Sequence, residues 1–97
     1  MNNLVLQIKA NASNVFTKLG FKHLHINAES VYENEGGYHK LTFVGGLNGF
    51  VIEWAPSFDK AQNNMYEDGD FIPISLGERE LMHRLENILF EHYGDVD

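Results

Sequence analysis

The chain has 97 residues, 43% of them hydrophobic, and it contains no cysteine, which excludes a disulfide framework, a thiolate metal site and a cysteine nucleophile. Its formal net charge is −7, and residues 51–97 carry eleven acidic and three basic side chains, against three and four in residues 1–50. This acidity disfavours nucleic acid binding, which depends on phosphate neutralisation by Lys and Arg, and the length and apolar content favour a single domain over residues 1–97.

The first predicted element is an amphipathic helix from about Asn3 to Leu19. Asn2 or Asn3 is its predicted N-cap, and Gly20 is predicted to end it. Apolar side chains recur along this segment at the 3.6-residue period of one helix face. They are Leu4, Val5, Ile8, Ala12, Val15, Phe16 and Leu19.

Three antiparallel strands are predicted after this helix. The first begins at Phe21 and ends at about Glu29, with apolar and polar side chains in alternation. The second covers Tyr38–Val44 after a turn at Asn34–Gly37, and the third covers Phe50–Ala55 after a glycine-rich connection. The expected product is a meander with one apolar and one solvated face.

A second helix and a short strand are predicted next. Ser57 is expected to cap a helix that continues to about Tyr66. The composition of Glu67–Asp70 is typical of a turn. Phe71–Ile74 is expected to form a short edge strand, because the residue before Pro73 avoids the helical conformation. The helix is expected to turn three side chains inward: Phe58, Ala61 and Met65.

The last predicted helix begins at a capping box, Ser75-Leu76-Gly77-Glu78, and ends at Gly94. One stripe of this helix is expected to be buried. It contains Leu81, Met82, Leu85, Ile88, Leu89 and His92. The order α-β-β-β-α-(β)-α predicts an α+β two-layer sandwich, in which helices cover one face of a three- to four-stranded antiparallel sheet.

Two histidines on the first predicted strand are the candidate metal ligands. His23 and His25 are two residues apart, so both imidazoles lie on one face of a strand, about 7 Å apart. A metal site needs a third ligand, from Glu29 or His39. Solvent-facing histidines are the favoured interpretation, and neither a metal nor another cofactor is predicted.

No pattern of catalytic residues is found in the sequence. The densest acidic cluster, Glu67, Asp68 and Asp70, does not match an EF-hand loop, and turn chemistry around Gly69 is favoured over a functional role. The glycines of residues 45–49 lack a P-loop lysine, and no serine lies in a nucleophile elbow. The chain is therefore predicted not to be an enzyme.

Three segments of the second half form a recognisable arrangement. They are Gly49-Phe50-Val51-Ile52-Glu53-Trp54-Ala55, Asn64-Met65-Tyr66-Glu67-Asp68-Gly69-Asp70 and Pro73-Ile74-Ser75-Leu76-Gly77-Glu78. This arrangement, over roughly residues 38–93, resembles the small immunity proteins of bacterial polymorphic toxin systems. The resemblance implies a cytoplasmic, non-catalytic inhibitor that binds a toxin domain and occludes its active site.

The concentration of charge agrees with this function, because toxins that act on nucleic acid present basic clefts that an acidic surface would fill. The contact residues expected in that case are Glu53, Glu67, Asp68 and Asp70, with Tyr66 as an aromatic anchor. Two other classes stay open: a regulatory or structural subunit, and a small metal- or ligand-binding domain that uses the histidine face. The charge is equally explained as a means of keeping a small domain soluble.

A cytoplasmic location without membrane contact is also expected. The start, Met1-Asn2-Asn3-Leu4, has no basic segment that leads into an apolar run. No stretch approaches the roughly 18 apolar residues of a membrane span. The absence of cysteine suits a reducing compartment.

Overall fold

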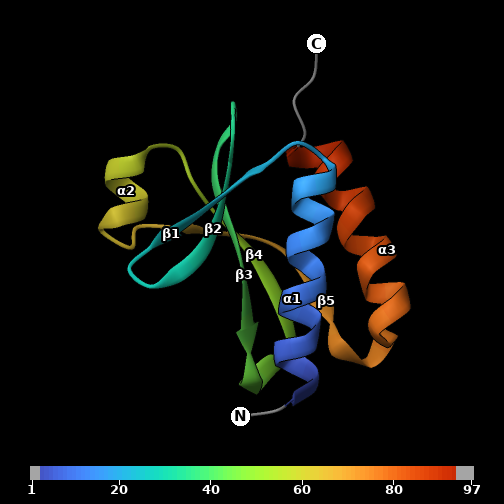
Figure 1. The fold of residues 1–97 in the computed structure, drawn as a ribbon. Helices are drawn as coiled ribbons and strands as arrows, with labels where there is room; N and C mark the ends of the chain where they lie inside the picture. The colour runs from blue at the N-terminus through green and yellow to red at the C-terminus, as the bar shows by residue number, and fades with distance from the viewer. Residues whose placement is uncertain (1–2, 94–97) are drawn as a thin grey trace.

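A computed structural model describes residues 3–93 and shows an α+β fold, in which a five-stranded antiparallel sheet packs against helices (Figure 1). The helices are α1 (Asn3–Lys18), α2 (Phe58–Gln62) and α3 (Glu78–Ile88), and a π-helical turn, η3 (Leu89–Tyr93), continues α3. The strands are β1 (Lys22–Ile26), β2 (Glu29–Asn34), β3 (Gly37–Val44), β4 (Gly49–Ala55) and β5 (Glu67–Pro73). They follow one another in space as a meander, β1-β2-β3-β4-β5. The predicted fold class is confirmed.

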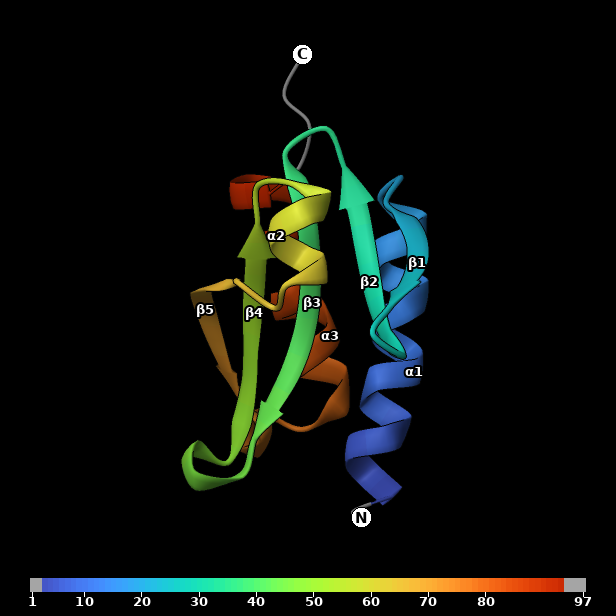
Figure 2. The same cartoon turned by 90° about the vertical axis from the view of Figure 1, so that its left-hand side faces the viewer.

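The two long helices lie side by side over one face of the sheet, as predicted (Figure 1). An ion pair joins them, with Lys18 Nζ 3.1 Å from a Glu86 carboxylate oxygen. The short helix α2 differs from the prediction, because it lies over one end of the opposite face (Figure 2). Ala61 attaches it there to Ile26, Val31 and Ala55. No helix among residues 3–93 is long and apolar enough to cross a membrane.

The main core lies between the sheet and the pair α1 and α3. Phe16 is its centre: the ring stacks on Tyr32 with 4.0 Å between centroids and meets Phe21 edge-on at 5.2 Å. Each large apolar side chain buried here contributes about 1.5–3 kcal/mol. The fully buried members are Ile8, Ala12 and Phe16 from α1, Phe50, Ile52 and Ile72 from the sheet, and Leu81, Leu85 and Leu89 from α3 and η3.

The end of α1 confirms the role predicted for Gly20. Its φ of 93° is the left-handed conformation that glycine adopts without a steric cost. The Gly20 amide donates to the Thr17 carbonyl, and the Phe21 amide donates to the Phe16 carbonyl. These two bonds form a Schellman motif, which turns the chain from α1 into β1.

The predicted first strand is wrong, because the segment from Phe21 to Glu29 reverses direction in a tight hairpin. Asn27 and Ala28, with φ of 55° and 65°, form its two-residue turn, so β2 is an additional strand. Alanine is not typical of left-handed backbone, and the alternation of apolar and polar residues continues through the turn. The Asn27 side-chain amide fixes the turn by donating to the Gln62 carbonyl oxygen at 2.8 Å.

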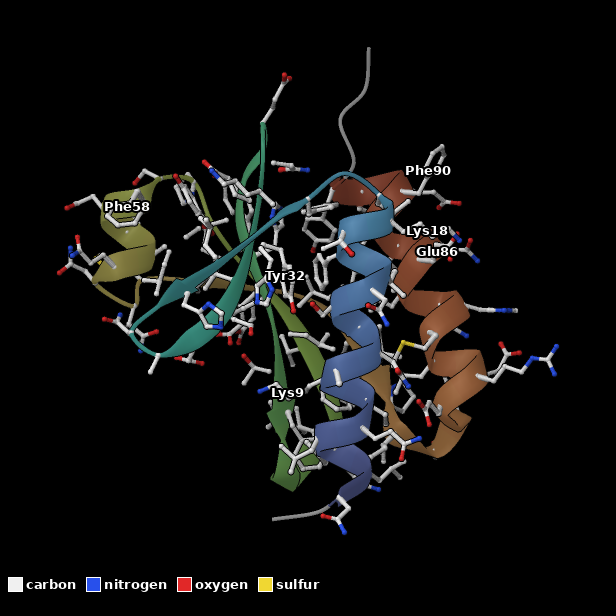
Figure 3. All side chains as sticks on the ribbon, viewed as in Figure 1. Lys9, Lys18, Tyr32, Phe58, Glu86 and Phe90 are labelled. Atoms are coloured by element: carbon white, nitrogen blue, oxygen red, sulfur yellow. The ribbon has the colours of Figure 1, made fainter. Side chains whose placement is uncertain are left out.

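Two predictions for the segment after Pro56 are also wrong. Helix α2 ends at Gln62 rather than at Tyr66, and Phe58 and Met65 are 50% and 57% exposed instead of buried. Figure 3 shows Phe58 on α2, away from the main core. The predicted turn at Glu67–Asp70 is the first half of β5, which pairs with β4. The pairing supplies partners for the backbone, and this overrides the turn-like composition. The predicted edge strand is thus confirmed but begins earlier.

The predicted capping box at the start of α3 is wrong. The helix begins at Glu78, its N-cap is Gly77 with φ of 83°, and no side chain caps it. Glu78 instead accepts hydrogen bonds from Gln7 Nε2, at 2.7 Å, and from Asn11 Nδ2 on α1. Near the C-terminal end of the predicted helix, His92 is exposed rather than buried. Asn2, a predicted N-cap, and Gly94, the predicted helix end, lie outside the described residues.

The two serines predicted as caps provide a direct test. Ser57 accepts a bond from the Lys60 amide at 3.2 Å, whereas Ser75 makes no cap bond. We expect Ser57→Ala to lower the free energy of unfolding by about 1 kcal/mol, and Ser75→Ala to change it by less than about 0.5 kcal/mol, in urea denaturation. A larger loss for Ser75→Ala would contradict the observed start of α3.

Candidate protein-binding face

The sheet has one face that is only partly covered. Helix α2 covers the start of β3 and the end of β4, and the rest of this face has no helix over it (Figure 2). We call this surface the open face, and define it by Thr42 on β3, Glu53 on β4, Asp68 and Phe71 on β5, and Tyr66 just before β5. Phe71 is opposite Val51 in the register and is 41% exposed. The open face therefore combines carboxylates with aromatic rings.

Two carboxylates of the open face lie opposite each other on neighbouring strands. Glu53 on β4 pairs in register with Asp68 on β5, next to a bulge that shifts the register. Thr42 Oγ1 donates a hydrogen bond to Glu53, and no cation of residues 3–93 forms an ion pair with either carboxylate. Like charges directly opposite each other destabilise a sheet.

The Tyr66 ring lies over the side chain of Lys40, and its hydroxyl is close enough to Glu53 to be influenced by that charge. The Lys40 ammonium is 4.3 Å from the centroid of the ring. The same ammonium is 3.3 Å from a Glu29 oxygen and 3.3 Å from the Asn64 side-chain oxygen. Burial raises the pKa of the Tyr66 hydroxyl, and the negative charges of Glu29 and Glu53 raise it further. Lys40 is also opposite Glu53 in the register of β3 and β4, but its ion pair is with Glu29.

Two of the five predicted contact residues lie away from the open face. Asp70 points towards the helical layer, where its carboxylate is 3.5 Å from His92 Nδ1. Burial raises the pKa of Tyr93, and Asp70 influences it through a backbone hydrogen bond that lowers it and a carboxylate that raises it. Glu67 is opposite Trp54 in the register, on the same side as the core residues of β4. The structure therefore groups only Glu53, Asp68 and Tyr66.

Residues not predicted as contacts complete the face. Phe71 lies on the segment predicted as an edge strand, and its alternation with the buried Ile72 indicates an outward side chain. Thr42 is opposite Val51 in the register of β3 and β4, and therefore lies on the same face. No comparable pattern indicates the buried position of Lys40, which depends on partners from three other segments.

The histidine pair does not gain the third ligand that a metal site requires. The His23 and His25 rings are 4.8 Å apart, and His23 Nε2 is 2.9 Å from Ser30 Oγ. Glu29 pairs with Lys40, and His39 is buried with Nδ1 3.1 Å from the Tyr32 carbonyl oxygen. Over residues 3–93 no group of three metal-ligating side chains is found.

Comparison with protein-family models, with curated proteins and with solved structures found no match. A functional proposal for this chain therefore depends on the chemistry of the open face. The carboxylates of Glu53 and Asp68, which form no ion pair within residues 3–93, and the exposed Phe71 ring suit a surface that is both basic and partly apolar.

The tyrosine pKa values predict how stability changes in alkaline solution. Burial raises the pKa of Tyr66 above its ordinary value of 10.0, so the folded state keeps a proton that the unfolded state loses as the pH rises past about 10. Stability therefore falls from about pH 10 upward. We expect the thermal midpoint of Tyr66→Phe to fall less between pH 9 and pH 11 than that of the parent, and equal slopes would contradict the burial of this hydroxyl.

Proposed function

We propose that this chain is a non-catalytic protein-binding domain, an inhibitor of the immunity type, whose open face occludes a basic cleft of a partner protein. The observation that carries the proposal is the cross-strand pair Glu53 and Asp68, which forms no ion pair within residues 3–93. Lys40 is opposite Glu53 on β3, but its ammonium is paired with Glu29. Two adjacent carboxylates gain most from a partner that brings Arg or Lys to them.

The position of these charges on the sheet supports binding over a purely solubilising role. Dispersed charges on helix surfaces, such as those of Glu80 and Glu91 on α3 and η3, are sufficient for solubility. Glu53 and Asp68 instead lie opposite each other, where like charges weaken the pairing of β4 with β5. A cationic surface would remove this repulsion on binding.

The aromatic residues of the open face supply the apolar part of the interface. Tyr66 and Phe71 lie near the two ends of the β5 segment that carries Asp68. Aromatic side chains contribute most of the binding energy in many interfaces, and the exposed Phe71 ring is available to a partner's Arg or Lys, whereas the Tyr66 ring already covers Lys40. Carboxylates between two such rings match a cleft that contains several basic residues.

The resemblance to immunity proteins supplies the class of partner. A toxin domain that acts on nucleic acid has a basic substrate cleft, and a negatively charged sheet face would compete with the phosphate backbone for it. The proposed domain therefore binds the toxin domain and not nucleic acid itself. A regulatory or structural subunit would bind its partner without blocking a reaction, which separates the two functions experimentally.

The decisive variant reverses the two opposed carboxylates. We expect Glu53→Lys/Asp68→Lys to weaken binding to the partner on the order of 100-fold, because two cationic groups of the partner then face like charges. The partner is captured at low salt from lysate of the native cell on the immobilised parent. Its affinity for the parent and the variant is then measured by calorimetry.

A matched control separates a specific site from net charge. Glu80→Lys/Glu91→Lys makes the same change in net charge on exposed positions of the helical layer. Equal losses in the two variants would refute the open face as the site. Inhibition of the partner's activity by an equimolar amount of the parent is expected, whereas tight binding without inhibition would favour a regulatory or structural subunit.

A further inference from the structure

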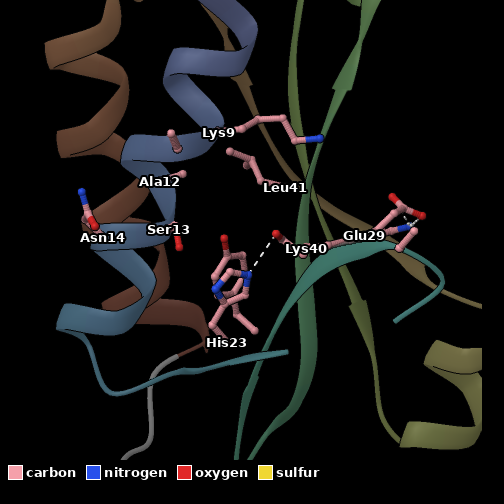
Figure 4. A pocket seen from close by; sticks show the side chains of 12 residues that line it. Lys9, Ala12, Ser13, Asn14, His23, Glu29, Lys40 and Leu41 are labelled. Atoms are coloured by element: carbon pink, nitrogen blue, oxygen red, sulfur yellow. Dashed lines mark hydrogen bonds and ion pairs between the residues drawn. The ribbon is translucent and has the colours of Figure 1, made fainter. Parts of the chain in front are cut away.

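A cavity of about 520 Å³ lies between α1, the hairpin of β1 and β2, and β3 (Figure 4). Its origin is the early separation of two strands. β2 pairs with β3 only next to their connecting turn, from Tyr32 opposite His39 to Asn34 opposite Gly37. β3 continues to pair with β4 as far as Val44. The first half of β2, which precedes Tyr32, has no pairing with β3. Helix α1 lies across the space between these two parts of the strands (Figure 4).

The walls of this cavity differ in polarity. Ala12, Tyr32 and Leu41 supply apolar surface, and the His23 ring stacks on Tyr32 with 4.9 Å between centroids and 21° between planes. Hydrogen-bonding side chains line the rest of the cavity. They are Lys9, Ser13 and Asn14 on α1, and His23, Glu29 and Ser30 on the hairpin. The Tyr32 ring lies between Phe16 and His23, so its edge and not a face lines the cavity. Apolar surface with polar groups around it is typical of a small-molecule site.

The charge of the cavity has the opposite sign to that of the whole domain. Glu29 and Lys40 both line it, but they form an ion pair at 3.3 Å and neutralise each other. Lys9 extends from α1 over the cavity (Figures 3 and 4) and forms no ion pair with any side chain of residues 3–93. Within the described part of the chain, the unpaired fixed charge at this cavity is therefore positive.

We propose that this cavity binds a small organic anion with a flat ring and one carboxylate or phosphate group. The anionic group lies at Lys9, with the Ser13 hydroxyl as a neighbouring donor, and the face of the ring packs against the edges of His23 and Tyr32, which is a favourable edge-to-face arrangement. The volume of about 520 Å³ lies within the range of about 300–1,000 Å³ that is usual for small-molecule sites. An ammonium without a carboxylate partner is the group that favours an anion over a neutral ring.

This site is independent of the proposed inhibitor function. The cavity opens beside α1, on the helical side of the sheet, whereas Glu53 and Asp68 lie on the open face. The ion pair of Glu29 with Lys40 lies between the two. Loss of one site is therefore expected to leave the other intact.

The test is a titration of the whole chain, followed by ¹H–¹⁵N correlation spectra, with benzoate, phenyl phosphate and the neutral benzyl alcohol. We expect saturable shifts at the amides of Ser13, His23 and Ser30 with at least one of the anions, and weaker binding of benzyl alcohol. The stronger of the two anions identifies the acidic group as a carboxylate or a phosphate. No saturable shift at these amides with either anion would overturn the proposal.

Two lysine variants with the same change in net charge sharpen the test. Lys9→Gln is expected to weaken binding of the preferred anion about tenfold and to leave that of benzyl alcohol unchanged. Lys60→Gln on α2, an exposed position away from the cavity, is expected to bind the anion like the parent. Equal affinity of Lys9→Gln and the parent, or equal losses in both variants, would refute Lys9 as the anion-binding group.

Discussion

The burial of the Lys40 ammonium is the constraint on which the rest of the sheet depends. Lys40 is only 7% exposed, and its ammonium needs partners because an unpaired buried charge is strongly destabilising. Those partners come from three other segments: Glu29 at the start of β2, Asn64 after α2 and Tyr66 before β5. One side chain thus holds together the hairpin, the short helix and the edge strand. It also forms the boundary between the acidic open face and the cavity beside α1.

Much of the fold is predictable because its information is local. The apolar period of α1, the glycine that ends it and the extended form of β3 and β4 act over a few residues, and they are confirmed except for Leu4, which is exposed. The predicted division into one apolar and one solvated face is wrong, because Lys40, Val51 and Ala55 are buried on the face that carries α2. The hairpin at Asn27 and Ala28 is not predictable in this way, because alanine in a left-handed turn is imposed by tertiary contacts such as the bond from Asn27 to Gln62. Composition was equally misleading for Glu67–Asp70, whose extended form depends on pairing with β4.

The candidate sites are less predictable than the fold, because they depend on register and on the separation of strands. The sequence suggests Glu53 and Asp68 as contact residues, but only the pairing of β4 with β5 makes them neighbours. Because of the bulge between β4 and β5, Asp70 lies on the opposite face of the sheet from Asp68, towards His92. The sequence has no pattern that indicates this change of register. The cavity results from the divergence of β2 from β3, so Lys9 has no sequence feature that distinguishes it from other helix lysines.

The place of β5 at the edge of the sheet gives its acidic residues a further role. Edge strands expose unpaired backbone groups and are templates for aggregation, which charged side chains counteract. Glu67, Asp68 and Asp70 occupy three of the first four positions of β5, so two copies that joined through these edges would bring six carboxylates together. Electrostatic repulsion therefore opposes the growth of a continuous intermolecular sheet through β5. Neutral substitutions in this segment would lower solubility even where they leave the fold and its stability unchanged.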